Sequence, residues 1–163
     1  MIAIIAEKPS VGQEIARVVG ATEKKDGYIT GNGYMVTWAL GHLVSLALPG
    51  TYGYTRTTAE DLPMLPEPFR LVERQIRTDR GMVTDIAAGR QLKVIDGVFS
   101  ECDSIIVATD AGREGELIFR WIYSHLGCTK PFKRLWFSSL TDEAIRKGMA
   151  DLREGYELSL IHI

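Results

Sequence analysis

Two short runs of consecutive hydrophobic residues stand out along the chain. Met1–Ala6 reads Met-Ile-Ala-Ile-Ile-Ala, and Ser104–Ala108 reads Ser-Ile-Ile-Val-Ala. Runs of this length without polar alternation are typical of strands buried on both faces, as in a parallel sheet. Apolar residues recur at helical spacing after each run, so the pattern predicts two buried strands that each lead into a helix.

The boundaries of the helices and of a further strand can also be predicted. Ser10 can cap the first helix, and Gly20 ends it. Another helix begins near Ala111, after the second buried strand. Thr141 caps a helix that has two acidic residues in its first turn, where the helix dipole favours them. A third core strand is predicted over Arg134–Phe137.

The remaining segments complete the fold class. Gly27–Ala39 predicts a β-hairpin around the turn Gly31-Asn32-Gly33, and the proline-rich residues 49–68 predict a loop. Leu71–Val98 predicts a strand and then a helix that includes Val83. Strands that alternate with helices predict an α/β fold with a mainly parallel central sheet flanked by helices, plus the β-hairpin as an insertion.

Composition narrows the class of protein. The chain has 163 residues, 45% hydrophobic and 25% charged, which fits one globular domain. It contains no apolar run long enough for a membrane helix and no signal peptide, so we expect a cytoplasmic protein. Cys102 and Cys128 are too far apart in sequence to indicate a disulfide framework or a zinc site. With 19 basic and 21 acidic residues, the chain lacks the basic excess of an autonomous nucleic-acid binder.

The candidate chemistry lies where the two buried strands end. Glu7 directly follows the first strand, Asp110 follows the second, and Glu114 comes one helical turn later. If the strands are neighbours, these carboxylates share the crevice at the carboxyl ends of the sheet. Mg²⁺ binds a few carboxylate oxygens together with water and substrate phosphate. Lys8 and Arg113 provide positive charge for phosphate oxygens at the same rim.

Each of these residues also has a purely structural interpretation. An isolated aspartate at a strand–helix junction is more often a helix cap, and Glu7 alone could be a solvated strand end. Arg113 and Glu116 are of types that usually lie at the surface. The occurrence of two such acidic junctions in one chain favours a functional site.

Several segments, in this order along the chain, resemble one family. They are Ala6–Ser10, Thr37–Leu43, Asp61–Pro63, Ala108–Glu116 and Arg134–Asp142. Together they resemble the Toprim domain of type IA DNA topoisomerases, in particular the bacterial topoisomerase III group, over most of residues 1–157.

The resemblance implies roles for the residues at the two junctions. Glu7 matches the glutamate that acts in proton transfer during strand cleavage and rejoining, and that lies near the metal. Asp110 and Glu114 match the first and last acids of the motif that holds Mg²⁺. Lys8 matches a lysine next to the scissile phosphate, and Arg113 lies beside the acids. A segment of single-stranded DNA is the implied partner.

The chain departs from the family pattern at two positions. Gly112 stands where the motif has its middle acid, so we expect metal binding through Glu7 and Asp110, with Glu114 assisting. Thr57 stands where the family tends to have a tryptophan near DNA. His42 is a candidate DNA contact, although a histidine in this context is more often a hydrogen-bonded structural residue.

Type IA topoisomerases also need a tyrosine nucleophile on another domain. None of the six tyrosines of this chain lies in a context that resembles that site. We therefore expect a Toprim domain over residues 1–157 that is inactive without its remaining domains. Residues 158–163 are expected to be a non-native or truncated tail. The alternatives are a Toprim primase or nuclease, and a non-catalytic receiver-like α/β module.

Overall fold

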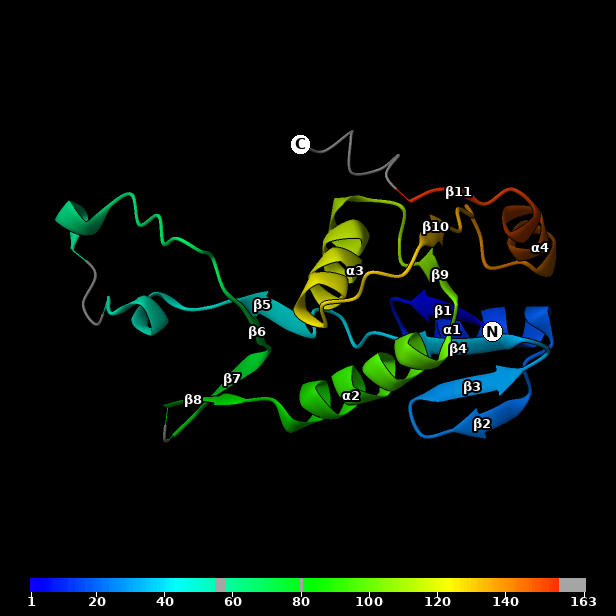
Figure 1. The fold of residues 1–163 in the computed structure, drawn as a ribbon, viewed down its shortest axis with the longest axis horizontal. Helices are drawn as coiled ribbons and strands as arrows, with labels where there is room; N and C mark the ends of the chain where they lie inside the picture. Colours follow the sequence, from blue (N-terminus) through cyan, green and yellow to red (C-terminus); the bar gives the residue numbers. More distant parts are fainter. Residues whose placement is uncertain (55–57, 80, 156–163) are drawn as a thin grey trace.

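In a computed structural model, which describes residues 1–54, 58–79 and 81–155, the chain forms an α/β fold around one large sheet (Figure 1). The strands of this sheet, in spatial order, are β11 (Arg153–Glu154), β10 (Phe132–Arg134), β9 (Ser104–Ala108), β1 (Ile2–Ala6), β4 (Tyr34–Trp38), β3 (Tyr28–Gly31) and β2 (Glu23–Lys25). The four central strands, β10, β9, β1 and β4, run parallel. The outer strands, β11 at one side and β3 and β2 at the other, pair antiparallel with their neighbours. The predicted α/β fold with a mainly parallel sheet is confirmed.

Strand β1 lies in the middle of the sheet and is covered on both faces. Ala3 and Ile5 pack into one hydrophobic core, whereas Ile4 and Ala6 pack into a second core on the opposite face. All four side chains are fully buried. A strand covered on both faces has no solvent-facing positions, which explains the unbroken hydrophobic run.

Two helices cover each face of the sheet. Helices α2 (Ile86–Glu101) and α3 (Arg113–His125) pack on one face, and helices α1 (Pro9–Val19) and α4 (Asp142–Ala150) pack on the other. Gly20 ends α1 in the left-handed conformation, and the Thr141 hydroxyl accepts a hydrogen bond from Ala144 at the start of α4, both as predicted. The predicted Ser10 cap is wrong. Lys8 is the N-cap of α1 because Pro9, whose ring suits the first helical position, begins the helix.

The predicted hairpin forms, but as part of the main sheet. Asn32 and Gly33 both have positive φ angles, of 50° and 82°, at the turn between β3 and β4. This geometry fits a two-residue turn that matches the twist of the strands. Strand β4 then pairs with β1, with Trp38 opposite Ala6, so the hairpin is not a separate insertion.

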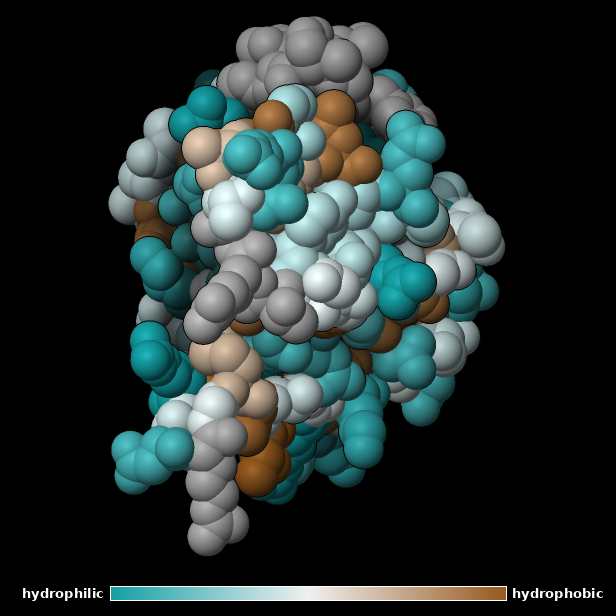
Figure 2. All heavy atoms as spheres, turned by 90° about the vertical axis from the view of Figure 1, so that its left-hand side faces the viewer, coloured by the Kyte–Doolittle hydropathy of each residue, from teal (hydrophilic) through white to brown (hydrophobic). Residues whose placement is uncertain are grey.

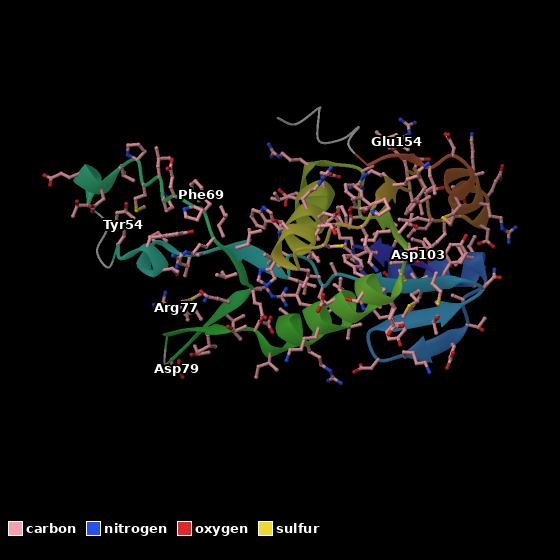
Figure 3. All side chains as sticks on the ribbon, in the orientation of Figure 1. Tyr54, Phe69, Arg77, Asp79, Asp103 and Glu154 are labelled. Carbon is pink, nitrogen blue, oxygen red and sulfur yellow. The ribbon has the colours of Figure 1, made fainter. Side chains whose placement is uncertain are left out.

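Residues 47–54 and 58–70 form an arm that extends away from the sheet (Figure 1). The arm begins and ends in a two-stranded sheet of β5 (Val44–Leu46) and β6 (Leu71–Glu73). Its only regular elements within the described residues are the short 3-10 helices η1 (Pro49–Tyr52) and η2 (Ala59–Asp61), in agreement with the predicted loop. Figure 3 places Tyr54 and Phe69 on this arm, far from Asp103 and Glu154 in the body. Seen from the tip of the arm, the surface is mainly hydrophilic with small hydrophobic areas (Figure 2).

Two predicted boundaries are wrong. A second hairpin, β7 (Gln75–Thr78) and β8 (Gly81–Thr84), contains Val83, which the sequence placed in a helix. Helix α2 begins only after Asp85, whose carboxylate accepts hydrogen bonds from the first-turn amides. The third core strand, β10, ends at Arg134 instead of beginning there.

Candidate active site

Glu7 and Asp110 meet at one edge of the central sheet. Strands β1 and β9 are parallel neighbours in which Ala6 lies opposite Ala108, so the chain leaves both strands at the same edge. The backbone N–H of Asp110 donates a hydrogen bond to the Glu7 carboxylate at 3.4 Å, although the two residues are 103 positions apart. Glu7 is half-buried and Asp110 is exposed. The structure therefore places these two predicted residues together.

The turn from β9 into α3 holds Asp110 close to the helix. The Gly112 amide donates a hydrogen bond to the Asp110 carbonyl at 2.8 Å. A Cβ atom on Gly115 would lie 2.1 Å from that carbonyl oxygen, well inside van der Waals contact. Only a glycine therefore allows the first turn of α3 to pack this closely against the backbone of Asp110.

Lys8 and Arg113 lie at the N-termini of α1 and α3, and both side chains are exposed. Among the described residues, neither side chain makes a hydrogen bond or an ion pair, and nor does the carboxylate of Asp110. Two cationic groups and one carboxylate are thus available to a ligand at this edge of the sheet.

Glu114 is directed to a different partner. Its carboxylate lies 3.0 Å from Nε2 of His42, whose ring packs edge-on against Trp121 at a centroid distance of 5.7 Å. The Arg74 guanidinium donates to the carbonyl oxygen of His42 at 3.3 Å and to that of Leu40 at 2.9 Å, and so holds the loop after β4. His42 therefore has the structural hydrogen bond that the sequence suggested.

The three acidic residues at the site differ in their surroundings. In the part of the chain that the structure describes, no three histidine, cysteine, aspartate or glutamate side chains are close enough together to hold a metal ion. Glu7 and Asp110 are adjacent, but Glu114 is paired with His42. Two carboxylates still fit a divalent cation such as Mg²⁺, which is commonly bound through one or two carboxylates and otherwise by water and substrate phosphate.

A buried polar network behind the site was missed by the sequence analysis. Glu116, of a type expected at the surface, is 6% exposed and forms an ion pair with Arg134, which is 2% exposed. Arg134 also donates to the carbonyl oxygen of Thr109 at 3.1 Å, and Arg120 donates to Glu116 at 2.7 Å. Burial lowers the pKa of Arg134, while the neighbouring Glu116 carboxylate acts to raise it. Because Glu116 and Arg134 are 18 positions apart, no local sequence pattern indicates that they form a buried ion pair.

The sequence also led to expectations for residues outside this site and for membrane-spanning helices. Trp136, which lies in the predicted core strand Arg134–Phe137, is 37% exposed, and the guanidinium of Arg153 lies 4.4 Å from its ring centroid. Thr57, Tyr156 and the tail 158–163 lie outside the described residues. Within residues 1–54, 58–79 and 81–155, no helix combines the length and hydrophobicity that crossing a membrane requires.

The comparison with known families gives a match over most of the chain. Residues 2–140, which include both acidic junctions, match the Toprim domain. The chain belongs to the Toprim family. The resemblance seen in the sequence is thus confirmed, and the receiver-like alternative is not supported.

This Toprim chain is similar to bacterial proteins named DNA topoisomerase 3. It is 44% identical to that of Bacillus licheniformis over 163 residues, which cover 98% of this chain and 21% of the relative. It is 46% identical to that of Bacillus subtilis over 158 residues, which cover 94% and 20%, and 48% identical to that of Bacillus anthracis over 157 residues, which cover 93% and 20%. The Toprim chain therefore spans about a fifth of the length of these relatives.

A solved structure supports the fold of this Toprim chain independently. Full-length topoisomerase I from Thermotoga maritima superposes with a TM-score of 0.57 at 20% identity, over 93% of this chain and 21% of that one. At this level of identity the likeness concerns the fold.

Proposed function

We propose that this chain is the metal-binding Toprim domain of a DNA topoisomerase III. Joined to a domain that carries the nucleophilic tyrosine, it would break, pass and rejoin single-stranded DNA without ATP, in the cytoplasm. The observation that carries the proposal is the contact between Glu7 and Asp110 at the carboxyl edge of the sheet. The identity of 44–48% to proteins named DNA topoisomerase 3 supports this reaction over that of a primase or a nuclease.

Glu7 and Asp110 are the proposed ligands of Mg²⁺. When bound, the ion would stabilise negative charge on the phosphate that is being cleaved. Glu114 would assist through the carboxylate oxygen that is not hydrogen-bonded to His42, since ligating carboxylates commonly keep such a hydrogen bond. Two protein carboxylates leave positions for water and for a phosphate oxygen of DNA.

The remaining site residues bind DNA and move a proton. Lys8 and Arg113, which are exposed and unpaired among the described residues, are proposed to bind the scissile phosphate through charge-assisted hydrogen bonds. When a tyrosine hydroxyl attacks the phosphate, the bond between phosphorus and the sugar oxygen breaks, the tyrosine loses its proton and the released sugar oxygen gains one, and rejoining requires the sugar proton to be removed again. Glu7 is proposed to give and take this proton. His42 is proposed as an additional DNA contact.

A cation titration of the chain tests this proposal. Mg²⁺ binding is measured by titration calorimetry. We expect the wild-type chain to bind Mg²⁺, and we expect Glu7→Gln and Asp110→Asn to bind it at least about tenfold more weakly, because each substitution removes a charged oxygen ligand. Asp26→Asn is the matched control, since Asp26 is exposed and pairs with Arg90 on the hairpin side of the sheet. Unchanged affinity in both site variants would remove the proposed metal site.

A further inference from the structure

The polar network behind the site connects the two ends of residues 110–114. Its members Thr109, Gly115, Glu116 and Arg134 form a closed ring of contacts, called the ring below. The Thr109 hydroxyl donates to the carbonyl oxygen of Gly115 at 2.7 Å. The Arg134 guanidinium donates to the Thr109 carbonyl at 3.1 Å and to the Thr109 hydroxyl oxygen at 3.4 Å, and it also pairs with Glu116. Thr109, Glu116 and Arg134 are all buried.

The members of this ring lie on both sides of the proposed metal loop. Thr109 directly precedes Asp110, and Gly115 directly follows Glu114. The ring therefore ties the two ends of residues 110–114 to each other and, through Arg134, to the end of β10. A displacement of either end would break hydrogen bonds of buried groups, which is costly.

We propose that Arg134 is a positioning residue of this site, which fixes the Asp110–Glu114 loop by bridging Thr109 and Glu116. It acts on the site through Asp110 and does not touch the substrate. The proposal rests on the proposed metal-binding function of Glu7 and Asp110.

The chemistry of the network supports positioning as its role. A buried ion pair adds little stability compared with hydrophobic residues of similar size, so stability alone does not account for this one. The planar guanidinium of arginine has several N–H donors in a fixed fork, so it can donate to the Thr109 carbonyl and to the Glu116 carboxylate at once. The single ammonium group of a lysine cannot reproduce this fork of donors. Partners that orient metal ligands from behind commonly control metal affinity.

The test uses the 163-residue chain and three variants. Arg134→Lys keeps the charge next to Glu116 but loses the fork, and Thr109→Val removes the hydroxyl bond to Gly115 at nearly constant volume. Arg120→Gln is the matched control, because Arg120 contacts Glu116 and the carbonyl oxygen of Gly155 but not Thr109. Mg²⁺ affinity is measured by calorimetry, the midpoint of thermal unfolding by circular dichroism, and amide hydrogen exchange of residues 110–114 by NMR.

We expect Arg134→Lys and Thr109→Val to bind Mg²⁺ roughly tenfold or more weakly than the wild type, with faster exchange in residues 110–114. Arg120→Gln should bind within about twofold of the wild type even where its unfolding midpoint falls, because the Thr109 bridge remains. Wild-type affinity in both Arg134→Lys and Thr109→Val, or an equal loss in Arg120→Gln, would overturn the positioning role.

Failure of the proposed function gives a different result. If the wild-type chain binds no Mg²⁺, the metal site is wrong, and the exchange rates alone decide the role of Arg134. Faster exchange confined to residues 110–114 in Arg134→Lys and Thr109→Val then supports the positioning role, and unchanged exchange overturns it.

Discussion

At the scale of single residues, the site depends on a close approach that tolerates no side chain at Gly115. A Cβ atom there would meet the carbonyl oxygen of Asp110 at 2.1 Å and its nitrogen at 2.7 Å. We expect Gly115→Ala to lower the free energy of unfolding by about 1–3 kcal/mol, because the start of α3 must move away from Asp110. Urea denaturation followed by circular dichroism measures this change.

Gly97 provides the control for that substitution. It also lies within a helix, but a Cβ atom there would meet no atom within 4 Å. Gly97→Ala should raise the free energy of unfolding by up to about 1 kcal/mol through helix propensity alone. If Gly115→Ala were as stable as Gly97→Ala, the tight packing of α3 on Asp110 would be refuted.

The two kinds of site residue differ in how far the sequence predicts them. Glu7 and Asp110 could be predicted because each follows a hydrophobic run, and the ends of parallel strands meet at one edge of a sheet. Glu116 and Arg134 could not, because a charged residue is buried only when a partner is present, and the partner is distant in sequence. The sequence thus predicts the placement of the two acids at the sheet edge better than that of the buried pair behind them.

At the scale of elements, one ion pair connects the start of α2 to the loop after β4. Arg74 pairs with Asp85 at 2.7 Å, and the same guanidinium holds the carbonyl oxygens of Leu40 and His42. Asp85 also caps α2 by accepting a hydrogen bond from Ala87 at 2.9 Å. His42 and Glu114 therefore depend on an element that is remote from both in sequence.

This ion pair predicts a dependence of stability on pH. The hydrogen bond from Arg74, together with those from the helix amides, holds the pKa of Asp85 below its ordinary value. A lowered pKa in the folded state adds stability that is present above the unfolded pKa, about 3.9 for aspartate, and that is lost as the pH falls through the folded pKa.

Asp85→Asn isolates this contribution, because asparagine still caps a helix but cannot pair with Arg74 as a charge. We expect the wild-type chain to be the more stable of the two at neutral pH, and the difference to shrink as the pH falls below about 5. Urea unfolding at a series of pH values measures it. A difference that stayed constant down to the lowest pH would contradict the assignment to Asp85, since the other carboxylates titrate in both proteins.

The elements were predictable where local chemistry determines them. The turn at Asn32 and Gly33 and the end of α1 at Gly20 both require positive φ angles, which the residue types reveal. The hairpin of β7 and β8 was missed because its strands have only four residues each and are half-exposed or exposed, so they lack a buried face that would give an alternating pattern. The order of strands in the sheet depends on long-range pairing that no local pattern contains.

At the scale of the whole molecule, the acids and cations at the sheet edge are only part of what the proposed cleavage needs, because a nucleophile must also attack the phosphate. Tyr123 donates its hydroxyl to the carbonyl oxygen of Lys130, and the hydroxyl of Tyr52 accepts from the Arg70 amide on the arm. Under the proposed function, the nucleophilic tyrosine belongs to another domain. We expect the 163-residue chain alone not to relax supercoiled plasmid in the presence of Mg²⁺, as measured by gel electrophoresis. Robust relaxation would contradict the proposal that a second domain supplies the tyrosine.

The same reasoning predicts that the chain can replace its counterpart in a relative. The Bacillus subtilis DNA topoisomerase 3 is 46% identical over 158 residues, and the matched region is 20% of that protein. A chimera with residues 1–155 of this chain in place of that region should relax supercoiled plasmid, because the proposed acids and cations would then be joined to the remainder of that protein. In the same chimera Glu7→Gln should slow cleavage of a single-stranded oligonucleotide by about 10²–10⁴-fold, the usual contribution of a general acid or base. Asp26→Asn, in the turn between β2 and β3 where Asp26 pairs with Arg90, should leave the rate unchanged. Because an unaltered circular dichroism spectrum would show that the Glu7→Gln chimera is folded, near-normal cleavage by it would refute the role of Glu7 without calling the fold into question.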